Sequence, residues 1–188
     1  VDIDAELKSS GGRLDLVCNL ILGWIVPGAA FVAHEAEEID TAPLKFIRDA
    51  TSTRVQTRAT HVGFGLAYVL PIIAAGLSLS EDGVILVENP EAHLHPFSQS
   101  RIGVFLALLA ALGRQVFVET HSDHVVNGIR LAMKLGVVSH SSVIFNHFSN
   151  RSDGAQSEFK QILAEADGAL DEWPAGFFDQ IERDLARL

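Results

Sequence analysis

Cysteine and basic residues are both scarce in this sequence. A single cysteine, Cys18, among 188 residues excludes a disulfide framework and a zinc ribbon, and it fits the reducing cytoplasm. The 14 Lys and Arg residues are outnumbered by 24 Asp and Glu residues, which gives a formal net charge of −10. This charge balance argues against non-specific binding of nucleic acid by the whole surface. It is compatible with a local basic face.

The sequence also lacks the features of a membrane or secreted protein. Leu16 to Ala33 and Val62 to Ser80 carry no charge, but Pro27-Gly28 and Pro71 interrupt them and neither has the flanking basic residues of a spanning helix. We expect both to be buried inside an α/β core. The chain begins with Val1 and acidic residues instead of a basic signal-peptide region or a methionine, so we expect it to be a piece of a longer polypeptide.

The centre of the chain alternates between apolar strands and helices. The pattern predicts strands at 84–88, 115–119 and 142–148, and helices at 66–79, 97–112 and 123–135, most of them bounded by glycine turns. The crossovers are long enough for right-handed helical connections, so the fold class is α/β with a mostly parallel sheet flanked by helices. Outside this region we expect a helix at 15–24, a hairpin within 43–61, a strand at 158–163 and a final helix near 177–188.

Polar side chains follow two of the predicted strands at the points where the strands end. Val84 to Val87 leads directly into Glu88, and Val116 to Val118 leads into a segment that contains His121. Ligands bind at the carboxyl ends of parallel strands. A carboxylate at the tip of an apolar strand is a good ligand for hydrated magnesium, and a histidine beside it can donate to a phosphoryl oxygen or to an attacking water.

Glycines precede the long apolar helix that is predicted from residue 66. Gly63, Phe64 and Gly65 would place backbone amides at a helix N-terminus, where an anion can bind. A simple turn explains such glycines equally well.

In this order the segments resemble the C-terminal half of an ABC-type ATPase head, a P-loop NTPase of the AAA-family branch that includes RecF-like, SMC-like and overcoming-lysogenization-defect (OLD) ATPases. "VILVENPEAHLHP" at 84–96 is similar to the Walker B strand and D-loop of that branch. "ETHSDH" at 119–124 is similar to its switch-histidine segment, and "VGFGLAYVLP" at 62–71 resembles a divergent signature motif. "WPAGFFD" at 173–179 resembles the tail of a bacterial subgroup of these ATPases.

The resemblance implies ATP and Mg²⁺ as cofactors, and two heads that engage as a homodimer around the nucleotide. Glu88 takes the Walker B role toward magnesium, His121 contacts the γ-phosphate, and Gly63, Phe64 and Gly65 contact nucleotide bound by the partner. Catalysis would be the in-line attack of water on the γ-phosphate. The implied domains are an N-terminal segment at 1–60, the half-head at 61–150 and an acidic appendage at 151–188. DNA repair or phage defence is the pathway that the family suggests.

Two departures from the family pattern are important. Asn89 stands where the family usually has its second acidic residue, so hydrolysis is expected to be slow unless Glu91 substitutes. None of the four lysines follows a Gly-x-x-x-x-Gly-Lys-Ser/Thr loop, which supplies the phosphate-binding amides and the lysine charge. We therefore expect a Walker A-containing N-terminal half on the same or another chain, without which this chain does not turn over ATP.

Two other functions stay open. A metal-dependent hydrolase would use the donors His93, His95, His121, Asp123 and His124 with Glu88 or Glu91. Alternatively, the chain is a non-catalytic dimerisation module in which the motifs serve partner engagement.

A local DNA contact is also compatible with the sequence. Lys45, Arg48, Arg54 and Arg58 lie on the predicted hairpin and would meet a phosphate backbone. A solvated hairpin face is the commoner explanation of such a group.

Overall fold

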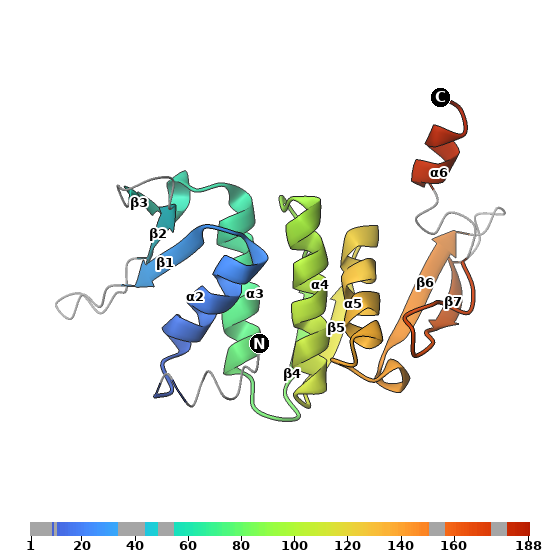
Figure 1. Ribbon diagram of the computed structural model, residues 1–188, viewed down its shortest axis with the longest axis horizontal. Helices are drawn as coiled ribbons and strands as arrows, with labels where there is room; N and C mark the ends of the chain where they lie inside the picture. Colours follow the sequence, from blue (N-terminus) through green and yellow to red (C-terminus); the bar gives the residue numbers. More distant parts are fainter. Residues whose placement is uncertain (1–8, 10, 34–43, 49–54, 151–156, 174–179) are drawn as a thin grey trace.

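The computed structural model describes residues 9, 11–33, 44–48, 55–150, 157–173 and 180–188. Helices and strands together form a mixed α/β fold (Figure 1). The order of the elements is α2 (Leu14–Ile25), β1 (Ala29–Ala33), β2 (Leu44–Arg48), β3 (Val55–Arg58), η2 (Ala59–His61), α3 (Phe64–Ser78), β4 (Val84–Glu88), α4 (Pro96–Ala111), β5 (Gln115–Glu119), α5 (Asp123–Lys134), η3 (His140–Ser142), β6 (Ile144–Asn150), β7 (Ser157–Leu163) and α6 (Gln180–Leu185).

The N-terminal part is a helix beside a three-stranded antiparallel sheet of order β1-β2-β3. The predicted hairpin is confirmed, since β2 and β3 pair from Lys45↔Arg58 to Arg48↔Val55. Sequence analysis missed β1, which lies in the second half of a charge-free stretch. The side chain of Asn19 in α2 explains this strand: it donates to the carbonyl of Phe31 at 2.9 Å and accepts the N–H of Phe31 at 2.7 Å.

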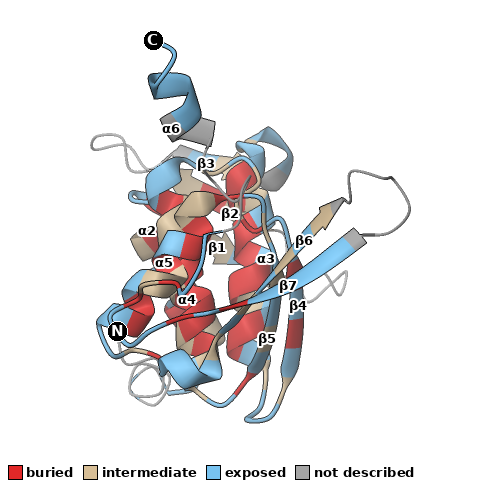
Figure 2. Cartoon of the chain, turned by 90° about the vertical axis from the view of Figure 1, so that its right-hand side faces the viewer, coloured by how far each residue is buried: buried red, intermediate tan, exposed pale blue. Residues whose placement is uncertain are grey.

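Strands β4 and β5 are parallel, in the register Val84↔Gln115 to Glu88↔Glu119. The helix α4 connects them, as the βαβ pattern predicts. Helices lie on one side of these strands and the other side is open (Figure 2). On the helix side Ile85 and Val87 are buried, whereas Leu86 on the opposite face is 75% exposed.

The third strand of the expected parallel series does not join this sheet. β6 pairs with β7 in a separate antiparallel sheet, in the register Ile144↔Leu163 to Asn150↔Ser157. The prediction of a continuous βαβαβ sheet is wrong at this point. Polar residues make up more than half of β6, whereas a strand inside a parallel sheet is normally apolar along its length.

Helices α4 and α5 pack with their backbones in close contact. A Cβ added to Gly103 would lie 2.3 Å from the carbonyl oxygen of Val125, and one added to Gly128 would lie 2.0 Å from that of Ser100. Glycine is therefore required at both positions. The contact brings the start of α5 beside α4, and this fixes where the segment that follows β5 lies.

The charge-free stretches are accounted for by buried elements. The first forms α2 and β1, and the second forms α3, with Ile21, Leu22, Val69 and Ile73 at most 1% exposed. Within the described ranges, no helix combines the length and hydropathy that are needed to cross a membrane.

Candidate functional site

The ends of β4 and β5 lie next to each other, as the sequence predicts for Glu88 and His121. Glu88 pairs with Glu119, and His121 follows two residues later. The N–H of Asn89 donates to the carbonyl of Glu119 at 2.8 Å, so the pairing continues beyond the strand end. The side chain of Glu88 is exposed. The ring of His121 is 80% exposed, with Nε2 at 3.9 Å from Oε1 of Glu119.

The loop after β4 is tightly folded. Asn89 and His93 both have positive φ, at 47° and 59°, and asparagine is one of the residues that tolerate this conformation. The N–H of Ala92 donates to the carbonyl of Asn89 at 3.0 Å, and the N–H of Leu94 donates to that of Glu91 at the same distance. The hydroxyl of Tyr68 in α3 donates to the carbonyl of Glu88. The backbone around the candidate site is therefore well anchored.

Glu91 has a structural role that sequence analysis did not foresee. Its Oε2 accepts the hydroxyl hydrogen of Thr120 at 2.6 Å, and its Oε1 accepts the N–H of His121 at 2.8 Å. Both carboxylate oxygens are therefore bound to the segment after β5. That Glu91 replaces the acid at position 89 stays a prediction.

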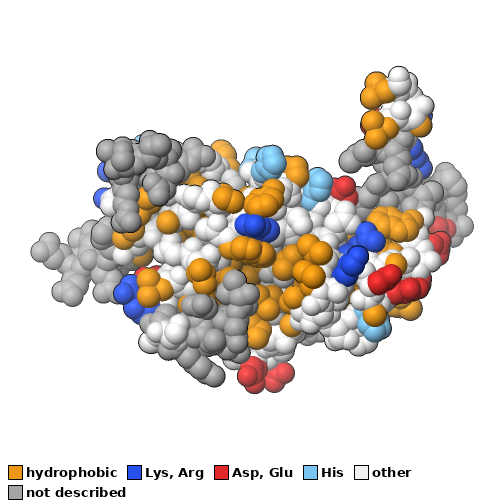
Figure 3. Space-filling model, viewed as in Figure 1, with side chains coloured by type: hydrophobic (Ala, Val, Ile, Leu, Met, Phe, Trp, Pro, Cys, Tyr) orange, Lys and Arg blue, Asp and Glu red, His pale blue; other side chains and the backbone are white. Residues whose placement is uncertain are grey.

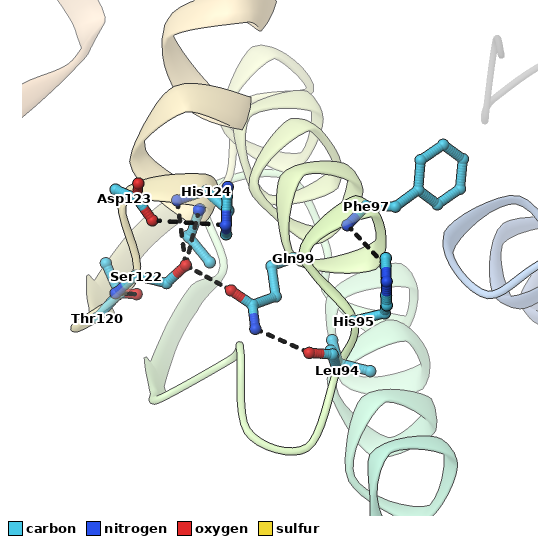
Figure 4. Close-up of polar contacts among 9 residues, drawn as sticks. Leu94, His95, Phe97, Gln99, Thr120, Ser122, Asp123 and His124 are labelled. Atoms are coloured by element: carbon cyan, nitrogen blue, oxygen red, sulfur yellow. Dashed lines mark hydrogen bonds and ion pairs between the residues drawn. The ribbon is translucent and has the colours of Figure 1, made fainter. Parts of the chain in front are cut away.

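A second set of hydrogen bonds joins the same two segments (Figure 4). The hydroxyl of Ser122 donates to Oε1 of Gln99 at 2.6 Å, and Nε2 of Gln99 donates to the carbonyl of Leu94 at 2.8 Å. Ser122 also caps α5, because its Oγ accepts the N–H groups of His124 and Val125 at 3.1 and 3.3 Å.

Gly63, Phe64 and Gly65 form the start of α3, but the three residues differ in exposure. Gly63 is exposed, and a Cβ added there would meet nothing within 4 Å. Phe64 is 77% exposed, with its ring centroid 5.5 Å from that of His93. Gly65 is buried, and a Cβ there would lie 2.6 Å from the carbonyl oxygen of His93. Gly65 thus serves the packing of α3 against the loop, and Gly63 and Phe64 face outward.

The donors of the alternative hydrolase site are not assembled. Within the described ranges, which include all of these donors, no three His, Cys, Asp or Glu side chains are grouped so that they could hold a metal ion. Nδ1 of His95 accepts the N–H of Phe97 at 3.4 Å, and Nε2 of His124 lies 3.7 Å from Oδ1 of Asp123. With His93 against Phe64, the histidines have separate partners. The described residues therefore give no support to the alternative of a metal-dependent hydrolase.

The basic residues of the hairpin are described in part. Lys45 and Arg58 are directly paired across β2 and β3, and Nζ of Lys45 donates to Oε1 of Gln56 at 3.3 Å. Arg54 and the side chain of Arg48 lie outside the described residues. On the face shown in Figure 3 the Lys and Arg side chains are scattered among hydrophobic and uncharged ones instead of forming a stripe.

The sequence matches two family models. The model described as "AAA domain, putative AbiEii toxin, Type IV TA system" matches residues 15–127, more than half of the chain. The chain belongs to this AAA-domain family. A model described as "Protein of unknown function (DUF3696)" matches residues 138–188, a range that contains the predicted tail motif, of which residues 174–179 are not described. No curated protein gives a significant match.

Solved SMC ATPase heads share the fold of this AAA-domain protein. A chain from a study of ATP-driven dimerization and DNA-stimulated activation of SMC ATPases has a TM-score of 0.57 and 10% identity, with 98% of each chain covered. The Smc head bound to the C-terminal winged-helix domain of ScpA has a TM-score of 0.56 and 15% identity, over 81% of this chain and 43% of that one. The Smc head from Pyrococcus furiosus bound to the C-terminal domain of ScpA has a TM-score of 0.56 and 14% identity, over 96% and 38%.

These matches confirm the predicted P-loop NTPase fold, which SMC ATPase heads share, and the predicted AAA family. The chain spans less than half of the two heads solved with ScpA domains.

Proposed function

We propose that this chain supplies the Walker B and switch-histidine half of an ATPase head, and that a Walker A-containing half on the same or another polypeptide completes the ATP site. The observation that carries the proposal is the parallel pairing of β4 and β5, with Glu88 opposite Glu119 and His121 two residues beyond. An acidic strand end can hold the Mg²⁺ ion that phosphoryl transfer uses, and a histidine beside it can donate to a phosphoryl oxygen.

The strand ends fit a hydrated magnesium ion. Glu88 and Glu119 are paired and both are exposed, and Mg²⁺ binds through one or two carboxylates while it keeps waters and phosphate oxygens as further ligands. Glu88 would hold the ion directly or through water. Bound there, Mg²⁺ neutralises the negative charge that develops on the phosphate oxygens.

His121 and Asn89 would act on the γ-phosphate side of the same site. The exposed ring of His121 can donate a hydrogen bond to a phosphoryl oxygen. The amide of Asn89 can orient a water molecule, but it cannot take the proton of that water, so we expect slow hydrolysis. The outward-facing Gly63 and Phe64 would contact the nucleotide of a second head in a homodimer.

The open face of the parallel strands supports a second half. Leu86 and Phe117 pair directly on this face and are 75% and 52% exposed, and Val84 beside them is exposed too. Parallel sheets are normally covered on both faces. Two of the similar heads extend far beyond the matched region. We therefore assign this face to the Walker A-containing half.

The biochemical test compares the chain alone with the chain joined to its Walker A half. We expect no measurable ATP turnover from the pure chain and Mg²⁺-dependent turnover from the complete head. Glu88→Gln or His121→Ala should then abolish turnover, whereas Glu81→Gln, a control at an exposed turn before β4, should not. Robust hydrolysis by the pure 188-residue chain would refute the need for a second half. Dimerisation with ATP binding but no turnover would instead identify a non-catalytic module.

The family resemblance suggests that the head binds DNA during repair or phage defence. Lys45 and Arg58 are paired on one side of the hairpin and would contact phosphates there, together with Arg48 and Arg54. We expect salt-dependent binding that weakens when all four are replaced by alanine. Absence of binding by the wild-type head at low salt would reject this part of the proposal.

A further inference from the structure

Glu91 links the two segments that carry the candidate catalytic residues. It belongs to the loop after β4, and its two carboxylate oxygens accept hydrogens from Thr120 and from the backbone of His121, at 2.6 and 2.8 Å. Thr120 Oγ1 in turn accepts the N–H of Ser122 at 3.1 Å. A charged acceptor makes stronger hydrogen bonds than a neutral one, so among the described residues this carboxylate makes the strongest link between the two segments.

The loop that carries Glu91 is itself fixed, which a positioning group requires. The N–H of Asn89 donates to the carbonyl of Glu119. The hydroxyl of Tyr68 donates to the backbone carbonyl of Glu88. At the other end of the loop, the carbonyl of His93 lies so close to Gly65 that no side chain fits between them. Movement of the Glu91 backbone is therefore restrained from both sides.

His121 is held by its backbone, and its ring faces the solvent beside Glu119. Its N–H is bound to Glu91, while 80% of its side chain is exposed. Because the backbone of His121 is already fixed, the solvent-facing imidazole loses less conformational entropy when it binds a ligand.

We propose that Glu91 is a positioning residue for His121: its carboxylate sets the backbone of the segment after β5 relative to the end of β4, and so directs the imidazole toward the terminal phosphate. The claim that the imidazole of His121 points toward the terminal phosphate rests on the proposed function. The hold on the backbone does not, because it is a property of this chain alone.

The variants of Glu91 and Thr120 separate this role from a general loss of packing. Glu91→Ala removes both hydrogen bonds. Glu91→Gln keeps a carbonyl oxygen for the N–H of His121 and changes the bond to Thr120. Thr120→Val removes the hydroxyl and leaves the bond to His121. Glu119→Ala is the matched control, because it removes a carboxylate near the His121 ring without touching the backbone N–H.

Amide hydrogen exchange on the 188-residue chain tests the hold on the backbone without any nucleotide. The exchange rate of His121 is measured relative to that of Val118 in β5, which corrects for global unfolding. We expect Glu91→Ala to raise this ratio at least about tenfold, and Glu91→Gln, Thr120→Val and Glu119→Ala to leave it within about threefold of wild type. If Glu91→Ala does not fold, Glu91→Leu replaces it. An unchanged ratio in the Ala or Leu variant overturns the proposal.

Turnover by the complete head tests the direction of the ring. Glu91→Ala should lower kcat about tenfold or more with little change in KM, whereas Glu91→Gln, which keeps an acceptor for the N–H of His121, should retain most of the wild-type kcat. Equal losses in the two variants would show that the hold on the His121 backbone does not carry the effect and would overturn the role toward His121. A wild-type head without turnover contradicts the proposed function, and the exchange ratio then decides the inference by itself.

Discussion

Glu88 and Glu119 stand directly opposite each other at the ends of two parallel strands, and both side chains are exposed. Like charges in directly paired positions destabilise a sheet. The strand ends therefore carry an unfavourable pair in the absence of a cation, which is a common feature of sites that bind one.

We expect Glu119→Gln to raise the free energy of unfolding of the isolated chain by about 0.2–1 kcal/mol at low salt. The gain should shrink as salt screens the repulsion. Urea denaturation at pH 8 measures it. Glu81→Gln, at the opposite end of β4, is the control and should have less effect. A destabilised Glu119→Gln protein would show that Glu119 makes a favourable contact instead.

Gly65→Ala should destabilise the chain, although alanine is the better helix former. The added Cβ would lie 2.6 Å from the carbonyl oxygen of His93. Overpacking costs about 1–3 kcal/mol, which exceeds the gain in helix propensity of about 1 kcal/mol. Gly63→Ala is the matched control, because its Cβ meets nothing within 4 Å. Thermal unfolding of the two variants should separate them, and equal melting temperatures would contradict the close contact.

We expect Asn89 to favour the stability of the chain at the expense of turnover, because asparagine tolerates the left-handed backbone but cannot accept a proton. Its φ is 47°, and a glutamate there costs roughly 1 kcal/mol in the left-handed region. In the complete head Asn89→Glu should raise turnover, because it adds a proton acceptor, while it lowers stability. Asn89→Gln should lower stability to the same extent without the gain in rate. If both variants have the same turnover as wild type, proton transfer at this position does not limit the reaction.

Much of this site was predictable from sequence because it depends on local patterns. The apolar runs at 84–88 and 115–119 have the bounds that the structure shows, and parallel pairing follows from the helix between them. The hairpin strands β2 and β3 were found for the same reason. These features require no knowledge of which residues meet over long distances.

The features that sequence analysis missed depend on such distant contacts. The strand β1 is bound by the side chain of Asn19, twelve residues from Phe31, and by its pairing with β2, and β6 pairs with the later strand β7 instead of the parallel pair. The role of Glu91 depends on Thr120 and His121, about thirty residues away. A carboxylate one residue after a proline gave no signal that it would bind a backbone N–H on the neighbouring strand end.

Cys18 should be almost unreactive in the folded chain. Burial, with a smaller contribution from Asp15, raises the pKa of its thiol to about 11, and the side chain is 2% exposed. The thiolate is the reactive form, so labelling at pH 8 should proceed at the rate of unfolding. Rapid labelling under native conditions would contradict the buried position.

The same shift predicts a loss of stability in alkali. Because the folded-state pKa is above the usual value, the folded chain keeps the proton longer than the unfolded chain. The contribution is complete below about pH 9 and decreases up to about pH 11, with a slope of up to about 1.4 kcal/mol per pH unit. Other groups titrate in this window, so the measurement is the difference in unfolding free energy between wild type and Cys18→Ala. This difference should decrease as the pH rises.

The open face of β4 and β5 gives the sharpest test of a second half. Leu86→Asp changes a side chain that is 75% exposed, so the unfolding free energy of the isolated chain should change by less than about 0.5 kcal/mol. Ile85→Asp, one residue earlier on the buried face, should unfold the chain, because an unpaired charge in the core costs several kcal/mol.

In the complete head Leu86→Asp should be harmful, although it has little effect on the isolated chain. If the Walker A-containing half covers this face, the carboxylate of Leu86→Asp is buried against it, and both the assembly of the head and ATP turnover should be lost although the isolated half remains folded. Co-purification of the two halves and the rate of phosphate release measure these effects. Normal assembly by Leu86→Asp would mean that the face stays in solvent, and the second half would then have to bind elsewhere.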